Sequence, residues 1–298
     1  MRILHLDAGK EMRGGQYQVL RLVEGLEAAG HECTLLARAG FPLFQAARKQ
    51  GWRVEPLGLA RTLAMAPRHD LIHAHDARTH TLGLLARGAP LVVARRVAFP
   101  IGPALSAKWK YGRARHYIAV SEFVKSVLER GGVPAEKISV VHDGVPLLEA
   151  NPARRGFLAP ANQDDPAKGA PLALEAARDA QVELKFSSNL ERDLPHAAIF
   201  VYITHSEGLG SGVLLAMGAG AAVIASKVGG LTEAIHHRHS GILVENRVEA
   251  VSAAIRELAD NSDLCRRLGA AARAAVEQRF TIDSMVRGTL EVYRRVIS

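Results

Sequence analysis

Aromatic residues, cysteines and long apolar runs are all scarce in this chain. Phe, Trp and Tyr make up only 5% of the 298 residues, which favours a core of aliphatic side chains from helices packed on sheets. The two cysteines, Cys33 and Cys265, lie far apart and show no zinc-site spacing. No apolar stretch approaches the roughly 20 residues of a membrane span, and the run at residues 1–7 is too short for a signal peptide. These absences predict a cytoplasmic protein with reduced thiols.

Signatures of nucleic-acid binding are also missing, although the chain is basic. Its 38 Lys and Arg residues against 30 Asp and Glu residues give a net charge of +8, which favours anionic partners such as nucleotide diphosphates or phospholipid surfaces. No helix-turn-helix, zinc-finger or RNA-recognition pattern is present, so we expect no nucleic-acid partner. Basic residues concentrate at Arg95 and Arg96 and again between residues 108 and 116. They predict either an anion site or a well-solvated surface.

The chain does contain a repeated alternation of short apolar strands and helices. Its length allows two domains, and 48% hydrophobic residues can fill their cores. In the first half, strands are predicted at residues 2–6, 33–37, 54–57, 70–74, 90–94, 117–120 and 138–141. After a Pro-containing interdomain segment at 147–166, they are predicted at 182–186, 199–203, 222–225 and 242–244. This order predicts parallel sheets with helices on both faces, and ligands at the carboxyl ends of the strands.

Two glycine-rich turns in the second half are the most informative part of the chain. Residues 206–212 read Ser-Glu-Gly-Leu-Gly-Ser-Gly and precede a helix of small apolar residues, and a second turn lies at residues 228–233. Such turns expose backbone N–H groups at a helix start, which suits a phosphate group. An NAD(P) site at the earlier pair Gly14 and Gly15 is disfavoured, because the glycine spacing is wrong and Arg38, not an acidic residue, follows the second strand.

Several stretches resemble the family 4 (group 1) retaining glycosyltransferases. Residues 117–123, 133–145 and 206–244 carry most of the resemblance, together with the strand that ends in His-Ala-His at 73–75 and the Lys-Gly pair at 168–169. The resemblance implies an α/β fold of GT-B type, in which two Rossmann-like doubly wound parallel-sheet domains face a cleft. It implies an acceptor-side domain at residues 1–150, a shortened donor domain at 151–280, and a helix at 281–298 that crosses back to the first domain.

The same resemblance implies a reaction and a set of site residues. The reaction is metal-independent, retaining transfer of a sugar from a nucleotide-diphosphate donor to a glycan or lipid-linked acceptor in cell-envelope polysaccharide or lipopolysaccharide synthesis, with no cofactor besides the donor substrate. By position, the catalytic residues would be His75, Glu207 and Lys168. The donor-binding residues would be Gly14, Gly15, Gly208, Leu209, Gly210 and Ser211. Arg95 and Arg96 are candidates for an anionic acceptor, which would also bring the protein to peripheral contact with an anionic inner membrane.

Three features depart from the family pattern and leave a second function open. Leu215 stands where the family has a second Glu that holds the ribose, and Gln163 stands where it has an Arg. A strand–helix unit that walls the base pocket is missing between Lys168 and Glu207. A GT-B protein that binds a ligand without catalysis therefore remains an alternative, as does a nucleotide-sugar epimerase.

The other histidines are predicted to be structural. His73 is expected to point to the opposite side of its strand from His75. The run of three histidines around Arg238 at residues 236–239 reads as a polar turn, since consecutive histidines cannot all face one ion and no Cys or carboxylate partner is spaced nearby. We therefore predict no metal site.

Overall fold

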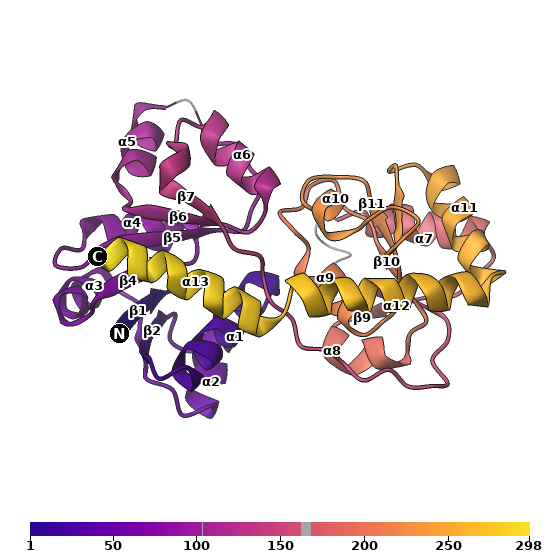
Figure 1. Ribbon diagram of the computed structural model, residues 1–298, viewed down its shortest axis with the longest axis horizontal. Coiled ribbons are helices and arrows are strands. Elements are labelled where there is room, and N and C mark those ends of the chain that lie inside the picture. Colours follow the sequence, from indigo (N-terminus) through magenta and orange to yellow (C-terminus); the bar gives the residue numbers. More distant parts are fainter. Residues whose placement is uncertain (103, 162–167) are drawn as a thin grey trace. The chain divides into compact units, whose positions relative to one another are not determined.

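The protein folds into two compact α/β units. The computed structural model describes residues 1–298 except residue 103 and residues 162–167 (Figure 1). The first unit combines Met1–Asp143 with Ile282–Ser298, and the second is Gly144–Thr281. The divide lies at Asp143, seven residues before the boundary expected at residue 150. Nothing in the described part of the chain forms a helix both long and apolar enough to cross a bilayer.

The first unit is built on a seven-stranded, all-parallel sheet. Its strand order is β3-β2-β1-β4-β5-β6-β7, the order of a doubly wound sheet. In chain order the strands are β1 (Arg2–Leu6), β2 (Glu32–Ala37), β3 (Val54–Pro56), β4 (Leu71–Ala74), β5 (Leu91–Arg95), β6 (His116–Ala119) and β7 (Ile138–Val140). Strands such as β4 are buried along their whole length, which explains their continuous apolar runs rather than alternating patterns.

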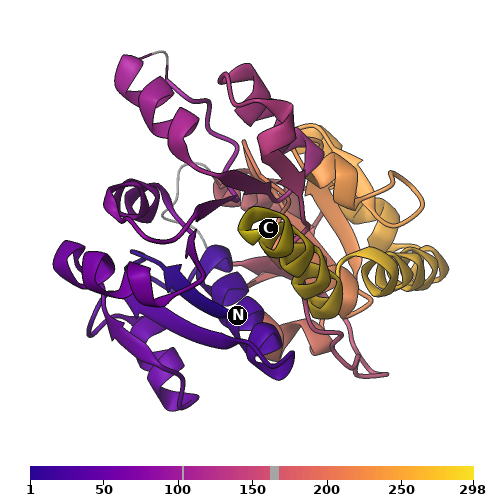
Figure 2. The ribbon, with the colours of Figure 1, turned by 60° about the vertical axis from the view of Figure 1, so that its left-hand side comes forward.

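Helices cover both faces of this sheet. They are α1 (Gly14–Ala28), α2 (Pro42–Lys49), α3 (Leu59–Met65), α4 (Ala77–Leu85), α5 (Leu105–Arg113), α6 (Glu122–Arg130) and α13 (Ile282–Ile297), with short 3-10 turns at Ala66–Arg68 and Ala135–Lys137. Helix α13, which ends at the C-terminus, packs on α1 of the first unit (Figure 2). It adds the fully buried Tyr293 to the same core cluster. Gly25 allows this close approach, because a Cβ there would lie 2.5 Å from Val286.

The second unit has a smaller parallel sheet, with strand order β12-β11-β10-β8-β9. Its strands are β8 (Phe157–Pro160), β9 (Leu184–Ser187), β10 (Ile199–Tyr202), β11 (Ala222–Ser226) and β12 (Ile242–Val244). Its helices are α7 (Ala170–Asp179), α8 (Leu190–Asp193), α9 (Ser211–Gly218), α10 (Leu231–Ala234), α11 (Val248–Ala259) and α12 (Ser262–Arg279), with a 3-10 turn at Leu194–His196. Helices α7 and α11 pack together, and α9 packs on α12 and β11.

Strand β8 corrects the interpretation of residues 147–166 as an interdomain segment. Phe157–Pro160 pairs with both β9 and β10 inside the second sheet. The four-residue strand is short and ends at a proline, and glycine and proline residues around it gave the segment the composition of a linker. Pro160 is tolerated because it closes the strand rather than lying at its centre.

Candidate active site

Lys168, Tyr202 and Glu207 form a connected acid–base cluster in the second unit. The Lys168 Nζ donates to Glu207 Oε2 at 2.6 Å and to the Tyr202 hydroxyl at 3.0 Å. The Tyr202 hydroxyl donates to the same Glu207 oxygen at 2.5 Å. The Lys168 and Glu207 side chains are 21% and 18% exposed, so the ion pair is accessible to a ligand. The structure brings the two predicted residues Lys168 and Glu207 into contact, and it adds Tyr202, which carried no signal in the sequence.

The backbone around this cluster explains why Lys168 and Glu207 meet. Tyr202 is the last residue of β10, and Lys168 pairs with Thr204 just beyond it in an isolated antiparallel bridge. Glu207 follows in the first glycine turn, where its Oε1 accepts from the Gly208 N–H at 3.2 Å. The cluster thus lies at the carboxyl end of a central parallel strand, where doubly wound sheets bind their ligands.

The two glycine turns are fitted directly against each other. The Gly230 N–H donates to the Glu207 carbonyl at 3.2 Å, and a Cβ on Gly230 would lie only 1.8 Å from the Gly208 carbonyl oxygen. Gly210 has a φ of +90°, which a residue with a side chain would rarely adopt. Only glycine fits at both points, so the second turn fixes the position of the first.

Helix α9 begins directly after this turn, at Ser211, and no side chain caps its N-terminus. The first amide groups of a helix lack intrahelical partners and attract anions. Leu209 and residues 213–218 are buried, so Leu209 contributes backbone rather than a ligand-facing side chain. Leu215 is only 5% exposed and is packed as a core residue. Gln163 lies outside the described residues.

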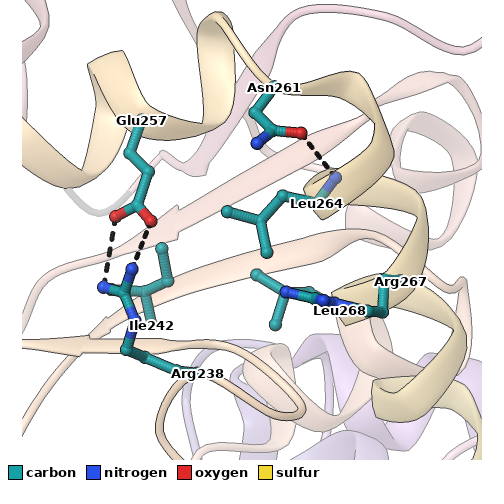
Figure 3. Close-up of a pocket in the computed structure, with 7 residues that line it drawn as sticks. All are labelled: Arg238, Ile242, Glu257, Asn261, Leu264, Arg267 and Leu268. Carbon is teal, nitrogen blue, oxygen red and sulfur yellow. Dashed lines mark hydrogen bonds and ion pairs between the residues drawn. The ribbon is translucent and has the colours of Figure 1, made fainter.

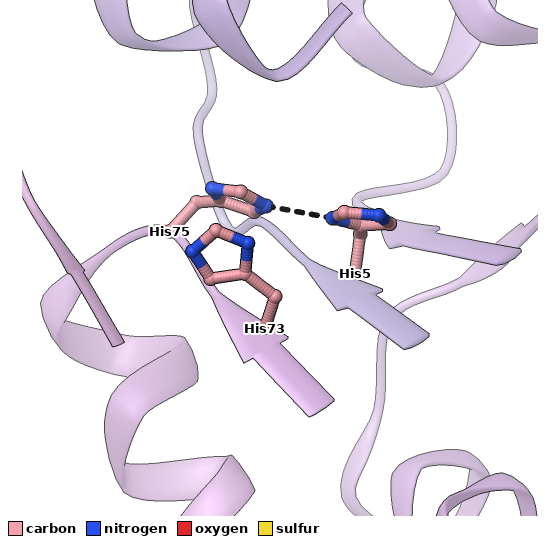
Figure 4. Close-up of side chains that lie close together, drawn as sticks. All are labelled: His5, His73 and His75. Carbon is pink, nitrogen blue, oxygen red and sulfur yellow. Dashed lines mark hydrogen bonds between the residues drawn. The ribbon is translucent and has the colours of Figure 1, made fainter. Parts of the chain in front are cut away.

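His5, His73 and His75 form a buried cluster in the first unit (Figure 4). The His5 Nδ1 and His75 Nε2 atoms are 3.0 Å apart, and the His73 and His75 ring centres are 4.1 Å apart. Burial lowers the pKa of His5 to about 3 and the pKa of both other histidines well below the usual value, and Arg96 contributes to each shift. All three rings are therefore neutral at neutral pH.

The prediction that His73 points away from His75 is wrong. Residues two apart on a strand project to the same face, so a histidine at each position brings the rings together. The His73 Nδ1 also contacts the Tyr293 hydroxyl of α13 at 2.6 Å. His73 thus links the cluster to the last helix.

Arg96 sets the direction of the hydrogen bonds in the histidine cluster. Its Nη1 lies 3.3 Å from His75 Nδ1, and its Nε forms an ion pair with Asp143 at 3.0 Å. A guanidinium can only donate, so His75 Nδ1 must accept and the His75 proton sits on Nε2. That proton is then donated to His5 Nδ1, which leaves the His5 proton on its Nε2. Asp143 holds Arg96 in place for this role.

The histidine cluster suits hydrogen bonding better than metal binding. Among the described residues, it is the one group of three or more His, Cys, Asp or Glu side chains whose ligand atoms lie within 4.8 Å of one another. A divalent cation there would lie beside the Arg96 guanidinium, and His75 would have to give up the proton that it donates to His5. The absence of a metal site stays a prediction.

The other predicted residues lie apart from these clusters within their own units. Gly14 and Gly15 are the first two residues of α1 rather than part of a loop before it, as a glycine pair would suggest, and their N–H groups lie in the first helical turn. Arg95 does not join Arg96: its guanidinium donates to the Tyr111 hydroxyl at 3.0 Å and to the Phe99 carbonyl at 2.5 Å. The two arginines therefore do not form one cationic patch.

A shallow pocket on the second unit contains none of the predicted residues. It has a volume of about 250 Å³ and lies where Arg238 and Ile242 face Glu257 of α11 and the start of α12 (Figure 3). Arg238 and Glu257 form an ion pair across it, and Arg238 has a φ of +63°. Arg238 belongs to the histidine-containing turn, which is therefore fixed by an ion pair.

Comparison with protein families identifies both halves of the chain. Residues 12–147 match the model described as Glycosyltransferase Family 4, and residues 162–275 match Glycosyl transferases group 1. The chain belongs to the family 4, group 1 glycosyltransferases. The family's two sequence models thus fall on the two structural units.

Curated relatives match this family 4 glycosyltransferase over about a third of its length. The D-inositol 3-phosphate glycosyltransferase of Streptomyces coelicolor is 41% identical over 103 residues, which is 34% of this chain and 22% of the relative. The alpha-maltose-1-phosphate synthase of Mycolicibacterium smegmatis is 36% identical over 110 residues, which is 35% of this chain and 28% of the relative. The matches therefore span between about a fifth and three tenths of these relatives.

Solved structures show that the glycosyltransferase has the GT-B fold. HepE of Anabaena, solved in complex with UDP-glucose, superposes with a TM-score of 0.87 at 17% identity and covers 99% of this chain and 100% of its own. Sucrose-phosphate synthase of Thermosynechococcus elongatus gives a TM-score of 0.79 at 18% identity, with 99% and 98% covered. Both structures therefore share their fold with this chain over nearly all of the given residues.

Proposed function

We propose that this protein transfers a sugar, with retention of configuration and without a metal, from a nucleotide-diphosphate donor to an acceptor glycan. The observation that carries the proposal is the contact of Lys168, Tyr202 and Glu207 beside the uncapped N-terminus of α9. Lysine and helix amides suit a diphosphate, and a carboxylate suits sugar hydroxyl groups. Membership of the glycosyltransferase family and the UDP-glucose complex of HepE support the same class of donor.

In this reaction the protein supplies positioning and charge rather than a covalent intermediate. The bond between the sugar C1 and the diphosphate oxygen breaks, and a bond from C1 to the acceptor oxygen forms on the same face. The acceptor proton leaves with the nucleoside diphosphate. Lys168 and the α9 amides offset the negative charge that develops on the leaving group, while Glu207 orients the sugar.

The neutral His75 ring is unsuited to proton transfer, and it would hydrogen-bond the transferred sugar by exchanging its contact with His5 or Arg96 for one with a sugar hydroxyl. Its pKa is held well below the usual value by burial, by His73 and by Arg96, so it stays uncharged at neutral pH. Gly14 and Gly15 at the start of α1 would contribute backbone N–H groups to the diphosphate. The acceptor we propose is a glycan or lipid-linked glycan of the cell envelope.

The first experiment is calorimetric titration with UDP, GDP, ADP and CMP, with Mg²⁺ and with a chelator, followed by turnover of UDP-glucose. We expect micromolar binding of one nucleotide that is the same in both buffers. Glu207→Gln should lower turnover about a hundredfold. Glu257→Gln is the matched control, because Glu257 forms an ion pair with Arg238 in the same unit away from this site. Equal turnover in the two variants would contradict the assignment of Glu207.

A second candidate function is binding of the same ligand without catalysis. It is favoured by the buried Leu215, which offers no carboxylate to a ribose. The two functions differ in one result: the binding protein would retain nucleotide affinity and show no donor turnover even before mutation.

A further inference from the structure

The segment from residue 77 to residue 121 contains no acidic residue and eight basic ones. The basic residues are Arg78, Arg87, Arg95, Arg96, Lys108, Lys110, Arg113 and Arg115. With 30 acidic residues in the chain, a stretch of this length would hold about four or five. This segment includes α4, β5, α5 and β6 of the first unit. Its charge is therefore of one sign over a continuous part of the fold.

The same segment carries large apolar side chains that are exposed to solvent. Leu105 is 83% exposed and Trp109 is 51% exposed, and both lie on α5 one helical turn apart, on the same face. Phe99 is 63% exposed and Val97 is 44% exposed in the connection between β5 and α5. The Arg113 guanidinium lies 4.9 Å from the Trp109 ring centre, so a cation extends the apolar stripe. We call Leu105, Trp109 and Arg113 the α5 stripe.

Internal contacts hold this region in shape. Arg95 donates to the Tyr111 hydroxyl of α5 and to the Phe99 carbonyl, and so ties the connection to the helix. The Lys110 Nζ donates to the Ala77 carbonyl at 2.6 Å, which fixes α5 to the start of α4. Because Arg95 and Lys110 are used internally, they are unsuited to a surface contact. Among the described residues of the segment, the exposed cations are Arg78, Arg87, Arg113 and Arg115.

We propose that the α5 stripe docks onto the surface of an anionic phospholipid bilayer. Leu105 and Trp109 enter the boundary between headgroups and acyl chains, and Arg113 lies at the level of the phosphates. Charge selects this occupant: four exposed arginines in a segment without an acidic residue complement an anionic surface, and Trp and Arg are typical of the membrane interface. Binding of the α5 stripe to a bilayer is a property separate from the proposed sugar transfer, and it can be measured without a donor or an acceptor.

The test uses Trp109 as its own reporter. The chain has two tryptophans, Trp52 and Trp109, so Trp52→Phe leaves a single one on α5. We expect the Trp109 emission to shift to the blue with vesicles of phosphatidylglycerol and phosphatidylcholine. Sedimentation should show at least about tenfold weaker binding to vesicles of phosphatidylcholine alone.

A matched pair of double variants isolates the stripe. Leu105→Ser with Trp109→Ser should lower vesicle binding about tenfold or more. Leu59→Ser with Leu63→Ser is the control, because these leucines are 45% and 42% exposed one turn apart on α3 of the same unit. Thermal melting checks that both variants fold. Equal loss in the two doubles, equal binding to neutral vesicles, an unshifted Trp109 emission, or lipid-free dimerisation through α5 would each overturn the proposal.

Discussion

The two clusters lie at equivalent places in the two units but handle charge differently. In the first unit the buried histidines in β1, in β4 and just after β4 are neutral, and Arg96, held by its ion pair with Asp143, sets the direction of the hydrogen bonds from His75 to His5. In the second unit Lys168 and Glu207 remain paired as ions about one fifth exposed at the end of β10. Full burial favours neutral side chains, whereas partial exposure allows an ion pair that a ligand can replace.

Gly230→Ala should have the largest effect and should act on the second cluster alone. Its Cβ would overlap the Gly208 carbonyl, so the two turns must separate and Glu207 must move. We expect a loss of about 2–4 kcal/mol in the free energy of unfolding, together with loss of nucleotide binding. Chemical denaturation and calorimetry measure both. Gly112→Ala is the control, since a Cβ there meets nothing within 4 Å and the fold should gain up to about 1 kcal/mol.

Lys168→Ala removes the cation of the second cluster without burying anything new. We expect kcat/KM for the donor to fall about a hundredfold, because the charge on the leaving diphosphate is no longer offset. Lys185→Ala on β9 of the same unit removes an exposed lysine and should change nothing. Steady-state kinetics of both variants measures the two kcat/KM values. An unchanged kcat/KM for Lys168→Ala would show that the Lys168–Tyr202–Glu207 cluster has only a structural role.

Tyr202→Phe sharpens the comparison by removing one hydroxyl from the charged cluster. That hydroxyl contacts both Lys168 and Glu207, so its loss frees both groups to shift. We expect the donor KM to rise about tenfold while kcat changes less, since a hydrogen bond to a charged group contributes roughly 1.5–3 kcal/mol. A Tyr202→Phe enzyme with an unchanged KM would rule out a positioning role for this residue.

Acid should weaken the first unit through its neutral histidines. The pKa of His5 is lowered to about 3 by burial, whereas an unfolded histidine titrates near 6.5. Between these values the unfolded chain binds a proton that the folded chain does not. The free energy of unfolding is therefore highest above about pH 6.5. As the pH falls below this value, each such histidine lowers the free energy of unfolding by up to about 1.4 kcal/mol per pH unit.

Urea denaturation across this pH range measures the slope, and His5→Gln should make it shallower. A glutamine keeps an oxygen that can accept from His75 but does not titrate. Identical slopes with and without His5 would mean that acid acts elsewhere in the molecule.

Much of the architecture could be predicted from the sequence because parallel strands are continuous apolar runs. Strands β1, β4 and β11 were predicted in this way. The glycine turns were predicted from their glycine content, and the GT-B fold from the family resemblance. Strand β8 was missed because Phe157–Pro160 is short and lies among linker-like residues. Periodicity alone cannot identify a four-residue strand whose partners are distant in sequence.

The candidate site residues could be named from the sequence, but their partners could not. The roles of Lys168 and Glu207 stay predictions, and their contact with Tyr202 was missed because a tyrosine at a strand end resembles an ordinary core residue. His5 and Asp143 were missed because their roles depend on contacts across 70 and 47 positions of sequence. The same-face rule for residues two apart would have placed His73 beside His75. Arg95 and Arg96 look alike in sequence, but adjacent strand residues face opposite sides and find different partners.

The return of α13 to the first unit has a consequence for synthesis on the ribosome. The core of that unit includes Tyr293 and Val296, so residues 1–143 cannot complete it when they emerge. The second unit begins and ends close together, since the Val145 N–H donates to the Phe280 carbonyl at 2.9 Å. All of its residues are therefore synthesised before α13. At about 5–20 residues per second, the unfinished first unit waits roughly 8–31 s until α13 (Ile282–Ile297) has been made. The half of the protein that is translated first is thus the half that folds last.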